Sequence, residues 1–183
     1  MVTATLRKTI DDLHVMPDDG RRYELIDGEI VVSASPSEPH YWVSRRLFLL
    51  LLPFDEIHRL GWLYYAPLEV QLPAGDAVQP DLFFFSRDRP PVRRGTHLEG
   101  VPAMIHEISS PCTRAVDRGK KLRAFERAGV PEYWMPDPEQ REVIALARRE
   151  RGYEWLPQIG GIIRSEVLPG FEVKVEALFA DLP

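Results

Sequence analysis

The sequence predicts an α/β fold, a mixed β-sheet with helices on both sides, and three observations carry that prediction. Runs with strand-like and helix-like periods follow one another in the order strand, helix, three strands, helix, strand. The run PAMIHEISS, residues 102–110, is of the kind found in strands buried on both faces. The pair Asp27–Gly28 marks a tight turn inside an alternating run near the N-terminus.

The first third of the chain predicts a lead-in, a hairpin and a long helix. Residues 1–20 are expected to form a short helical or irregular segment. Residues 21–34 alternate around Asp27–Gly28, which indicates a β-hairpin. From His40 to about Ile57 the period is helical and the central turns are almost uniformly apolar, so this helix is expected to be buried.

Further strands and a second helix are expected after this helix. Residues 61–72 predict one strand, bent or ended near Pro67, and residues 77–86 predict the next, with Pro80 at its start or at an edge. Residues 87–100 read as a loop before the buried run already described. Ser110–Pro111 predicts the start of the second helix, because serine caps helices and proline suits the first helical position.

The remainder of the chain predicts the end of that helix and the last strands. Gly129 is a natural C-terminal cap, so the helix is expected to end at Ala128. Residues 131–137 and 141–156 predict further strands, the second forming part of a hairpin, and residues 165–183 predict a short strand and a final helical turn.

Length and composition limit the class of protein. The 183 residues suit one domain, residues 1–183, with a sizeable core. No stretch is long and apolar enough to cross a bilayer, and the N-terminus lacks the apolar core of a signal peptide, so the cytoplasm is expected. The lone Cys112 excludes an internal disulfide and a cysteine-based zinc site. The net charge of −5 argues against a general nucleic-acid coating protein.

The amide and lysine content is biased. The chain has no Asn and has 17 Pro, a trend of thermophile proteins that a skewed genomic base composition also produces. Arginine far outnumbers lysine, and the only lysines are Lys8, Lys120, Lys121 and Lys174. Two of these four are adjacent and follow the predicted buried strand.

Two acidic residues stand in runs that otherwise indicate buried strands. These are Asp81 in QPDLFFF and Glu107 in MIHEISS. Carboxylates are almost never fully buried unless they are paired or bound to a cation. Together with the backbone carbonyl of Ile108 they could hold Mg²⁺ or Mn²⁺, with open positions for water and substrate. Singly, each has a structural alternative: Glu107 could cap a neighbouring helix, and Asp81 could be partly exposed.

Helical geometry separates the adjacent lysines. At 100° per residue, Lys121 lies on the apolar arc with Leu122 and Phe125, and Lys120 lies on the opposite face. Lys121 is therefore expected to point toward the sheet, where it could orient water or neutralise charge on a phosphate. Asp117, one turn earlier, could pair with Lys121, in which case the two would form an ordinary surface ion pair.

Two further residues keep alternatives open. Glu24 could contribute a metal or water contact, or could be an exposed carboxylate of the hairpin. His40 could support the acidic residues or contact a phosphate, although helix capping is favoured for it. A nucleophile at Ser110 or Cys112 is disfavoured, because the chain has no G-x-S-x-G elbow.

Taken together, the motifs resemble the Uma-two (Uma2) family of the PD-(D/E)XK, restriction-endonuclease-like superfamily. The resemblance covers nearly the whole chain from Tyr23 onward and implies an αβββαβ core with a magnesium-dependent nuclease site. Its segments are YELIDGEIV (23–31), the SP…H loop (35–40), VQPDLFFF (78–85), HEISSPCT (106–113), DRGKKLRAFERAGVPEYWMPDP (117–138) and LPGF (168–171).

The resemblance assigns roles residue by residue. Asp81 matches the first acidic motif of the family, Glu107 the second, and Glu24 a recurrent acid of the N-terminal hairpin. The lysine usual two positions after the second acid is replaced here by Ser109. Lys121 matches the place to which the family's lysine has moved, on the following helix.

The leading hypothesis from the sequence is a metal-dependent DNA endonuclease with Asp81, Glu107, Lys121 and Glu24 in its site, functioning as a homodimer. The alternative is a catalytically inactive module on the same fold that binds nucleic acid or a protein partner. Ser109 at the usual lysine position and the acidic net charge motivate the alternative.

Overall fold

The computed structural model describes residues 6–33 and 35–182. Residues 1–5 of the predicted lead-in and residue 34 of the predicted hairpin therefore lie outside the described residues. The lead-in contains one short helix, α1 (Ile10–His14), which begins with a capping box between Thr9 and Asp12. The hairpin is confirmed as β1 (Arg22–Ile26) paired with β2 (Glu29–Ser33). Asp27 and Gly28 both have positive φ, as a two-residue turn of this kind requires.

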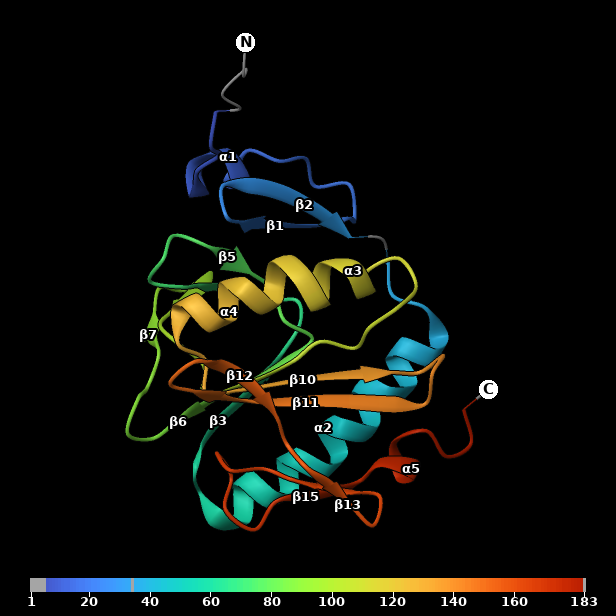
Figure 1. Cartoon of the computed structure of the whole chain (residues 1–183). Helices are drawn as coiled ribbons and strands as arrows, with labels where there is room; N and C mark the ends of the chain where they lie inside the picture. Colours follow the sequence, from blue (N-terminus) through green and yellow to red (C-terminus); the bar gives the residue numbers. More distant parts are fainter. Residues whose placement is uncertain (1–5, 34, 183) are drawn as a thin grey trace.

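The predicted mixed α/β architecture is confirmed, and its centre is a six-stranded sheet in the order β12-β11-β10-β9-β6-β3 (Figure 1). Its only parallel pair is β9 with β10, and the helical segment between them forms the crossover. Its strands are β3 (Gly61–Tyr65), β6 (Leu82–Ser86), β9 (Met104–His106), β10 (Glu132–Asp137), β11 (Glu142–Arg149) and β12 (Gly152–Trp155).

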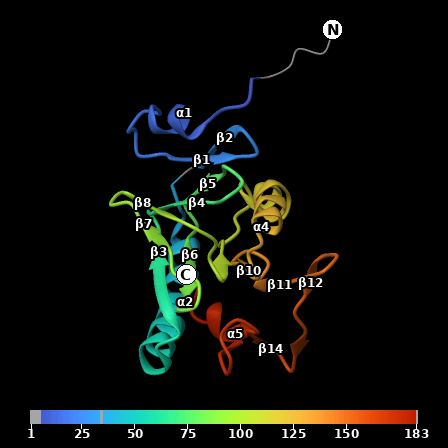
Figure 2. The same cartoon turned by 90° about the vertical axis from the view of Figure 1, so that its left-hand side faces the viewer.

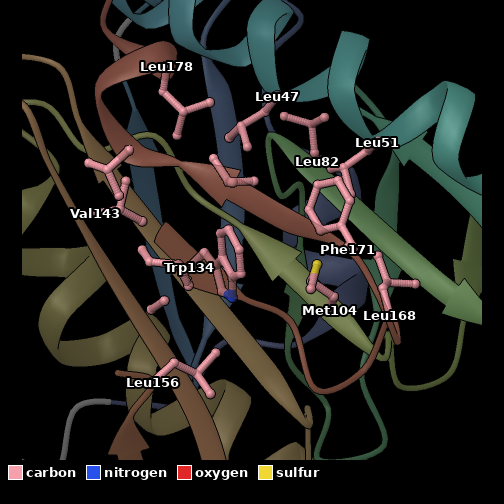
Figure 3. Close-up of a cluster of buried hydrophobic side chains, with 14 of the residues drawn as sticks. Leu47, Leu51, Leu82, Met104, Trp134, Val143, Leu156, Leu168, Phe171 and Leu178 are labelled. Carbon is pink, nitrogen blue, oxygen red and sulfur yellow. The ribbon is translucent and has the colours of Figure 1, made fainter. Parts of the chain in front are cut away.

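Helices cover both faces of this central sheet. On one face lies α2 (Glu38–His58), whose Leu47 and Leu51 pack with Trp134 and Phe171 (Figure 3). On the other face lies α4 (Leu122–Ala128), whose Phe125 packs against residues of β6 and β10. The helix α4 ends at Gly129, in the left-handed conformation, as predicted.

The burial predicted for the long helix is correct for one stripe only. Val43, Leu47 and Leu51 are buried, but Leu49 is 53 % exposed and Leu50 is 41 % exposed. The apolar residues of the central turns surround the helix, whereas the sheet covers only one side of it. The prediction that this helix is buried was therefore wrong for the side that faces away from the sheet.

Two segments predicted as single strands each divide between two sheets. Residues 61–72 form β3 in the central sheet and β4 (Glu69–Gln71) in a second sheet, and residues 77–86 form β5 (Ala77–Val78) in the second sheet and β6 in the central one. The second sheet has the order β2-β1-β5-β4-β8-β7 and lies above the central sheet in Figure 1. The short strands β7 (Val92–Arg93) and β8 (His97–Glu99) belong to it and interrupt the predicted loop. The chain thus crosses from one sheet to the other at Pro80–Asp81.

The second predicted helix begins three residues late and is not regular. Ser110 and Thr113 close a turn through their hydroxyls, and α3 (Arg114–Val116) follows it. The π-helical turn η1 (Asp117–Lys121) then leads into α4, with the Leu122 N–H donating to the Asp117 carbonyl. Such single π-turns are frequent at functional sites.

The C-terminal part adds a three-stranded sheet in the order β13-β14-β15. Its strands are β13 (Gln158–Ile159), β14 (Ile162–Arg164) and β15 (Glu172–Lys174), and α5 (Val175–Leu178) follows them near α2 (Figures 1 and 2). Within residues 6–33 and 35–182, no helix combines the length and hydropathy that a membrane span requires.

Candidate metal and catalytic site

Asp81 lies between β5 and β6 and is buried. Its Oδ1 accepts a hydrogen bond from Arg22 Nη1 at 3.0 Å. Its Oδ2 lies 2.9 Å from His40 Nε2 and accepts another bond from the Ile108 N–H at 2.9 Å. Three groups from three separate segments therefore fix this carboxylate.

Lys121 connects two other carboxylates that are also buried. Its Nζ lies 2.8 Å from Glu107 Oε1 and 2.9 Å from Glu24 Oε2. The other oxygen of Glu24 accepts a hydrogen bond from the Gln79 N–H at 2.8 Å. Glu24, Glu107 and Lys121 come from β1, the end of β9 and η1. The sequence gives only their order along the chain, and the fold brings their side chains together.

Strand register explains why the two principal acids are neighbours. The antiparallel pairing of β6 with β9 places Leu82 opposite His106. Continuing that register by one position places Asp81 opposite Glu107. Arg22 precedes Glu24 by two residues on β1, so both side chains project from the same face toward this point.

The π-turn separates the two lysines as helical phase predicted. Lys121 is buried beneath the helix, whereas Lys120 is partly exposed and forms an ion pair with Glu29 of the hairpin. The alternative of a surface ion pair between Asp117 and Lys121 is not found, because both residues are buried and among the described residues no ion pair joins them. Asp117 is instead buried and accepts a hydrogen bond from Ser109 Oγ at 3.4 Å. Ser109, which occupies the position of the family's usual lysine, thus belongs to the same cluster.

Burial and neighbouring charges act in opposite directions on the acids. Burial acts to raise the pKa of Asp81, but the His40 hydrogen bond and the charges of His40 and Arg22 outweigh it and lower that pKa to about 2. Burial is the main reason why the pKa of Glu107 lies well above its usual value. The positive charge of Lys121 lowers this pKa only in part, and repulsion from Asp81 and Glu24 raises it further. For Lys121, burial acts to lower the pKa, but Glu107 and Glu24 raise it above the usual value. Lys121 is therefore a protonated cation at neutral pH.

The donor set fits a hard divalent cation. The cluster contains more acidic side chains than permanent cations: the buried acids are Glu24, Asp81, Glu107 and Asp117, and the cations are Arg22 and Lys121. Within the part of the chain that the structure describes, no three His, Cys, Asp or Glu side chains form a ready cage for a metal ion. Magnesium nevertheless needs only one or two protein carboxylates and keeps several waters.

A cleft of about 670 Å³ opens beside this cluster. Asp81, Arg22 and His40 form its base, and the start of α2 and the end of β3 form its walls. The cleft gives a substrate a route to Asp81, while Lys121 and Glu107 remain behind it in the protein interior.

Some sequence predictions for this region were incomplete. His40 does not cap the helix, since Ser37 occupies the capping position and His40 contacts Asp81. For Ile108, the structure gives a contact from the N–H to Asp81, whereas the expected role for its carbonyl stays a prediction. Arg22 was missed, although its i, i+2 relation to Glu24 in a strand was a signal that could have found it.

Comparisons with known proteins agree with the fold. Residues 10–176 match the model of the Uma2 family, described as "Putative restriction endonuclease". The crystal structure of a putative nuclease belonging to DUF820 from Anabaena variabilis is similar, with a TM-score of 0.76 and 18 % sequence identity over 93 % of this chain and 97 % of that chain. No curated protein matches the chain. Because the family match spans most of its length, the chain belongs to the Uma2 family, and the resemblance inferred from its motifs is confirmed.

Proposed function

From membership in the Uma2 family, we propose that this chain is a divalent-metal-dependent endonuclease that hydrolyses phosphodiester bonds in DNA. The observation that carries the proposal is the meeting of Asp81, Glu107 and Lys121 in one buried cluster beside an open cleft. The nuclease family and the nuclease-like structural neighbour support it.

Asp81 and Glu107 are the residues that would hold the metal, with the Ile108 carbonyl as a further oxygen donor. When bound, Mg²⁺ or Mn²⁺ would polarise the scissile phosphate and lower the pKa of a coordinated water. Arg22 and His40 hold the Asp81 carboxylate in one orientation and keep it ionised. This leaves Asp81 charged at every pH near neutrality.

Lys121 serves the reaction as a fixed positive charge. Because Glu107 and Glu24 keep it protonated, it stabilises the charge that develops on the phosphate instead of abstracting a proton. Glu24 is a positioning residue, since it contacts Lys121 and receives the Gln79 N–H. Glu24 and Glu107 thus hold the Lys121 amine in the cluster, and this lysine would supply the positive charge that Ser109 cannot supply.

The direct test is cleavage of supercoiled plasmid DNA in the presence of Mg²⁺ or Mn²⁺. The parent should nick the plasmid, and a chelator should stop the reaction. Asp81→Ala and Lys121→Ala should each lower the rate by at least ~10²-fold. Lys120→Ala is the matched control, because it removes the adjacent but partly exposed lysine, and it should cut within about twofold of the parent. Unchanged cutting by Asp81→Ala and Lys121→Ala would contradict the proposal.

A second function has one specific observation in its favour. Arg22, His40 and Lys121 already contact the oxygens of Asp81 and Glu107, which suits a module that needs no metal and binds nucleic acid or a protein partner without cleaving it. Absence of Mn²⁺ binding, with the fold intact, would favour this alternative. The cytoplasmic location, the homodimer and the thermophilic source stay predictions from the sequence.

A further inference from the structure

We propose that the cleft beside Asp81 binds an unpaired nucleobase, so that the preferred substrate is DNA that is single-stranded or locally unpaired. The inference rests on the proposed function, because it assigns a substrate class to the same site. It comes from the residues that line the cleft, which the metal and lysine chemistry does not use.

One wall of the cleft is a single face of α2. Tyr41, Ser44, Arg45 and Phe48 line it, and their spacing of three and four residues places them along one stripe of the helix. Tyr65, at the end of β3, also lines the cleft. The cleft therefore runs between an aromatic and basic helix face and the tyrosine-bearing edge of the central sheet.

The aromatic side chains at this cleft are unusually accessible. Tyr41 and Tyr65 are each 62 % exposed, so each ring leaves a large apolar area in contact with water. Phe48 packs edge-to-face against Tyr65 with ring centroids 5.2 Å apart, which holds Tyr65 in place. Tyr41 likewise packs edge-to-face against His40, so each exposed tyrosine is held by a neighbouring ring and could offer a face on which a base stacks.

The charges around the cleft complement a nucleic-acid strand. Three arginines line it, Arg21, Arg22 and Arg45, against the single carboxylate of Asp81. Arg21 pairs with Asp19 and Arg22 with Asp81, whereas Arg45 forms no ion pair within the described residues and lies over the Trp42 ring at 5.3 Å. In a chain with a net charge of −5, this local excess of arginine favours a phosphate beside Arg45.

Stacking selects for unpaired bases. Inside a continuous duplex both faces of a base are covered by its neighbours, so tyrosines can reach them only if the base leaves the stack. A cleft of about 670 Å³ admits a single nucleotide together with its phosphate, and Asp81 lies at its base. A single strand has no base pair to break before a base enters the cleft, and it therefore binds more tightly than a duplex.

The experiment measures binding of labelled oligonucleotides by fluorescence anisotropy in the presence of a chelator, which prevents cleavage. The probes are a DNA single strand, its duplex, the same duplex with an unpaired base, and an RNA single strand of the same sequence. The single strand and the duplex with an unpaired base should bind at least about tenfold more tightly than the continuous duplex.

Variants assign the preference to the tyrosines. Tyr41→Leu and Tyr65→Leu should each weaken single-strand binding by roughly 5- to 100-fold, the range expected for the loss of one stacked base. Tyr41→Phe and Tyr65→Phe keep the ring and should bind within about twofold of the parent. Trp155→Leu is the control, because Trp155 is 67 % exposed but does not line the cleft, and it should bind like the parent.

The outcomes separate this inference from the proposed function. Equal affinity for the continuous duplex, unchanged binding by both leucine variants, or binding of RNA without DNA would overturn the inference. Tyrosine-dependent binding of single strands, combined with no cleavage in Mg²⁺ or Mn²⁺, would support it and refute the nuclease. If the protein cleaves duplex and single-stranded DNA equally fast, and Tyr41→Leu and Tyr65→Leu cleave at the rate of the parent, the nuclease is supported and the inference is refuted.

Discussion

Glu107 and Glu132 are two equally buried glutamates on neighbouring strands of the central sheet, and their surroundings differ in kind. Glu132, at the start of β10, accepts hydrogen bonds from Trp134 Nε1 at 2.6 Å and Ser165 Oγ at 3.0 Å. It also accepts the N–H groups of Glu166 and Val167, both at 3.0 Å. These donors are neutral, and they tie the C-terminal segment to the central sheet.

Glu107, at the end of β9, has one lysine and several acids around it instead of neutral donors. Burial is the largest cause of a raised pKa for both glutamates, so neither burial nor the direction of the pKa shift distinguishes them. What distinguishes them is whether their hydrogen-bonding and charge requirements are met by fixed protein groups. A site for a cation is expected where they are not met.

The largest expected effect is on cleavage. Glu107→Gln keeps the shape of the side chain but removes the carboxylate that would hold the metal, and it should lower plasmid cleavage by at least ~10²-fold. Glu132→Gln, the same change on the next strand, should leave the cleavage rate per folded molecule within about threefold of the parent. Equal losses in both variants, measured on protein shown to be folded by circular dichroism, would remove the distinction between the two glutamates.

The next effect is on stability and concerns Glu132. Glu132→Ala leaves several buried donors without a partner, and each costs about 1–3 kcal/mol, so the free energy of unfolding should fall by roughly 3–5 kcal/mol. Glu154→Ala, at an exposed position on β12, should change it by less than about 0.5 kcal/mol. Urea unfolding followed by tryptophan fluorescence measures both; a change below about 1 kcal/mol in Glu132→Ala would show that its hydrogen bonds are not structural.

The comparison also explains how far the sequence could predict this protein. Asp81, Glu107 and Lys121 were identifiable because charged residues interrupt apolar patterns and because helical phase is a local property. Three of the four hydrogen-bond donors of Glu132 lie more than thirty residues away in sequence, so the residues near it do not indicate its role. Pairing register, which places Asp81 opposite Glu107, is likewise a property of the assembled sheet.

A local sequence pattern could not predict that residues 61–72 and 77–86 each divide between two sheets, for the same reason. Each half of these segments has strand character, and only the tertiary structure decides which sheet it joins. The π-turn η1 was also unpredictable, because its residues DRGKK suit a regular helix equally well. The contact from Arg22 to Asp81 joins the two sheets, and the contacts from Lys121 to Glu24 and Glu107 start from the π-turn.

A smaller effect is expected in the pH dependence of stability. The pKa of Asp81, about 2 in the folded protein, is below the value near 3.9 of an unfolded chain. Ionised Asp81 therefore stabilises the fold above about pH 4, and this contribution is lost as the pH falls toward 2. The difference in unfolding free energy between the parent and Asp81→Asn should shrink by about 2–3 kcal/mol between neutral pH and pH 2.

The control for this experiment is Asp181→Asn, because the Asp181 side chain is 83 % exposed. Asp181→Asn should lower the free energy of unfolding only slightly, by an amount nearly independent of pH. Urea unfolding at several pH values measures both variants. A pH-independent difference for Asp81→Asn would mean that Arg22 and His40 do not hold its charge.

The central claim, that Asp81 and Glu107 form a divalent-cation site and Glu132 does not, is tested most directly by calorimetric titration of Mn²⁺ into the metal-free protein. The account predicts saturable binding by the parent and by Glu132→Gln, and affinity at least about tenfold weaker in Asp81→Asn and Glu107→Gln. Absence of binding by the parent, or unchanged affinity in both Asp81→Asn and Glu107→Gln, would contradict it.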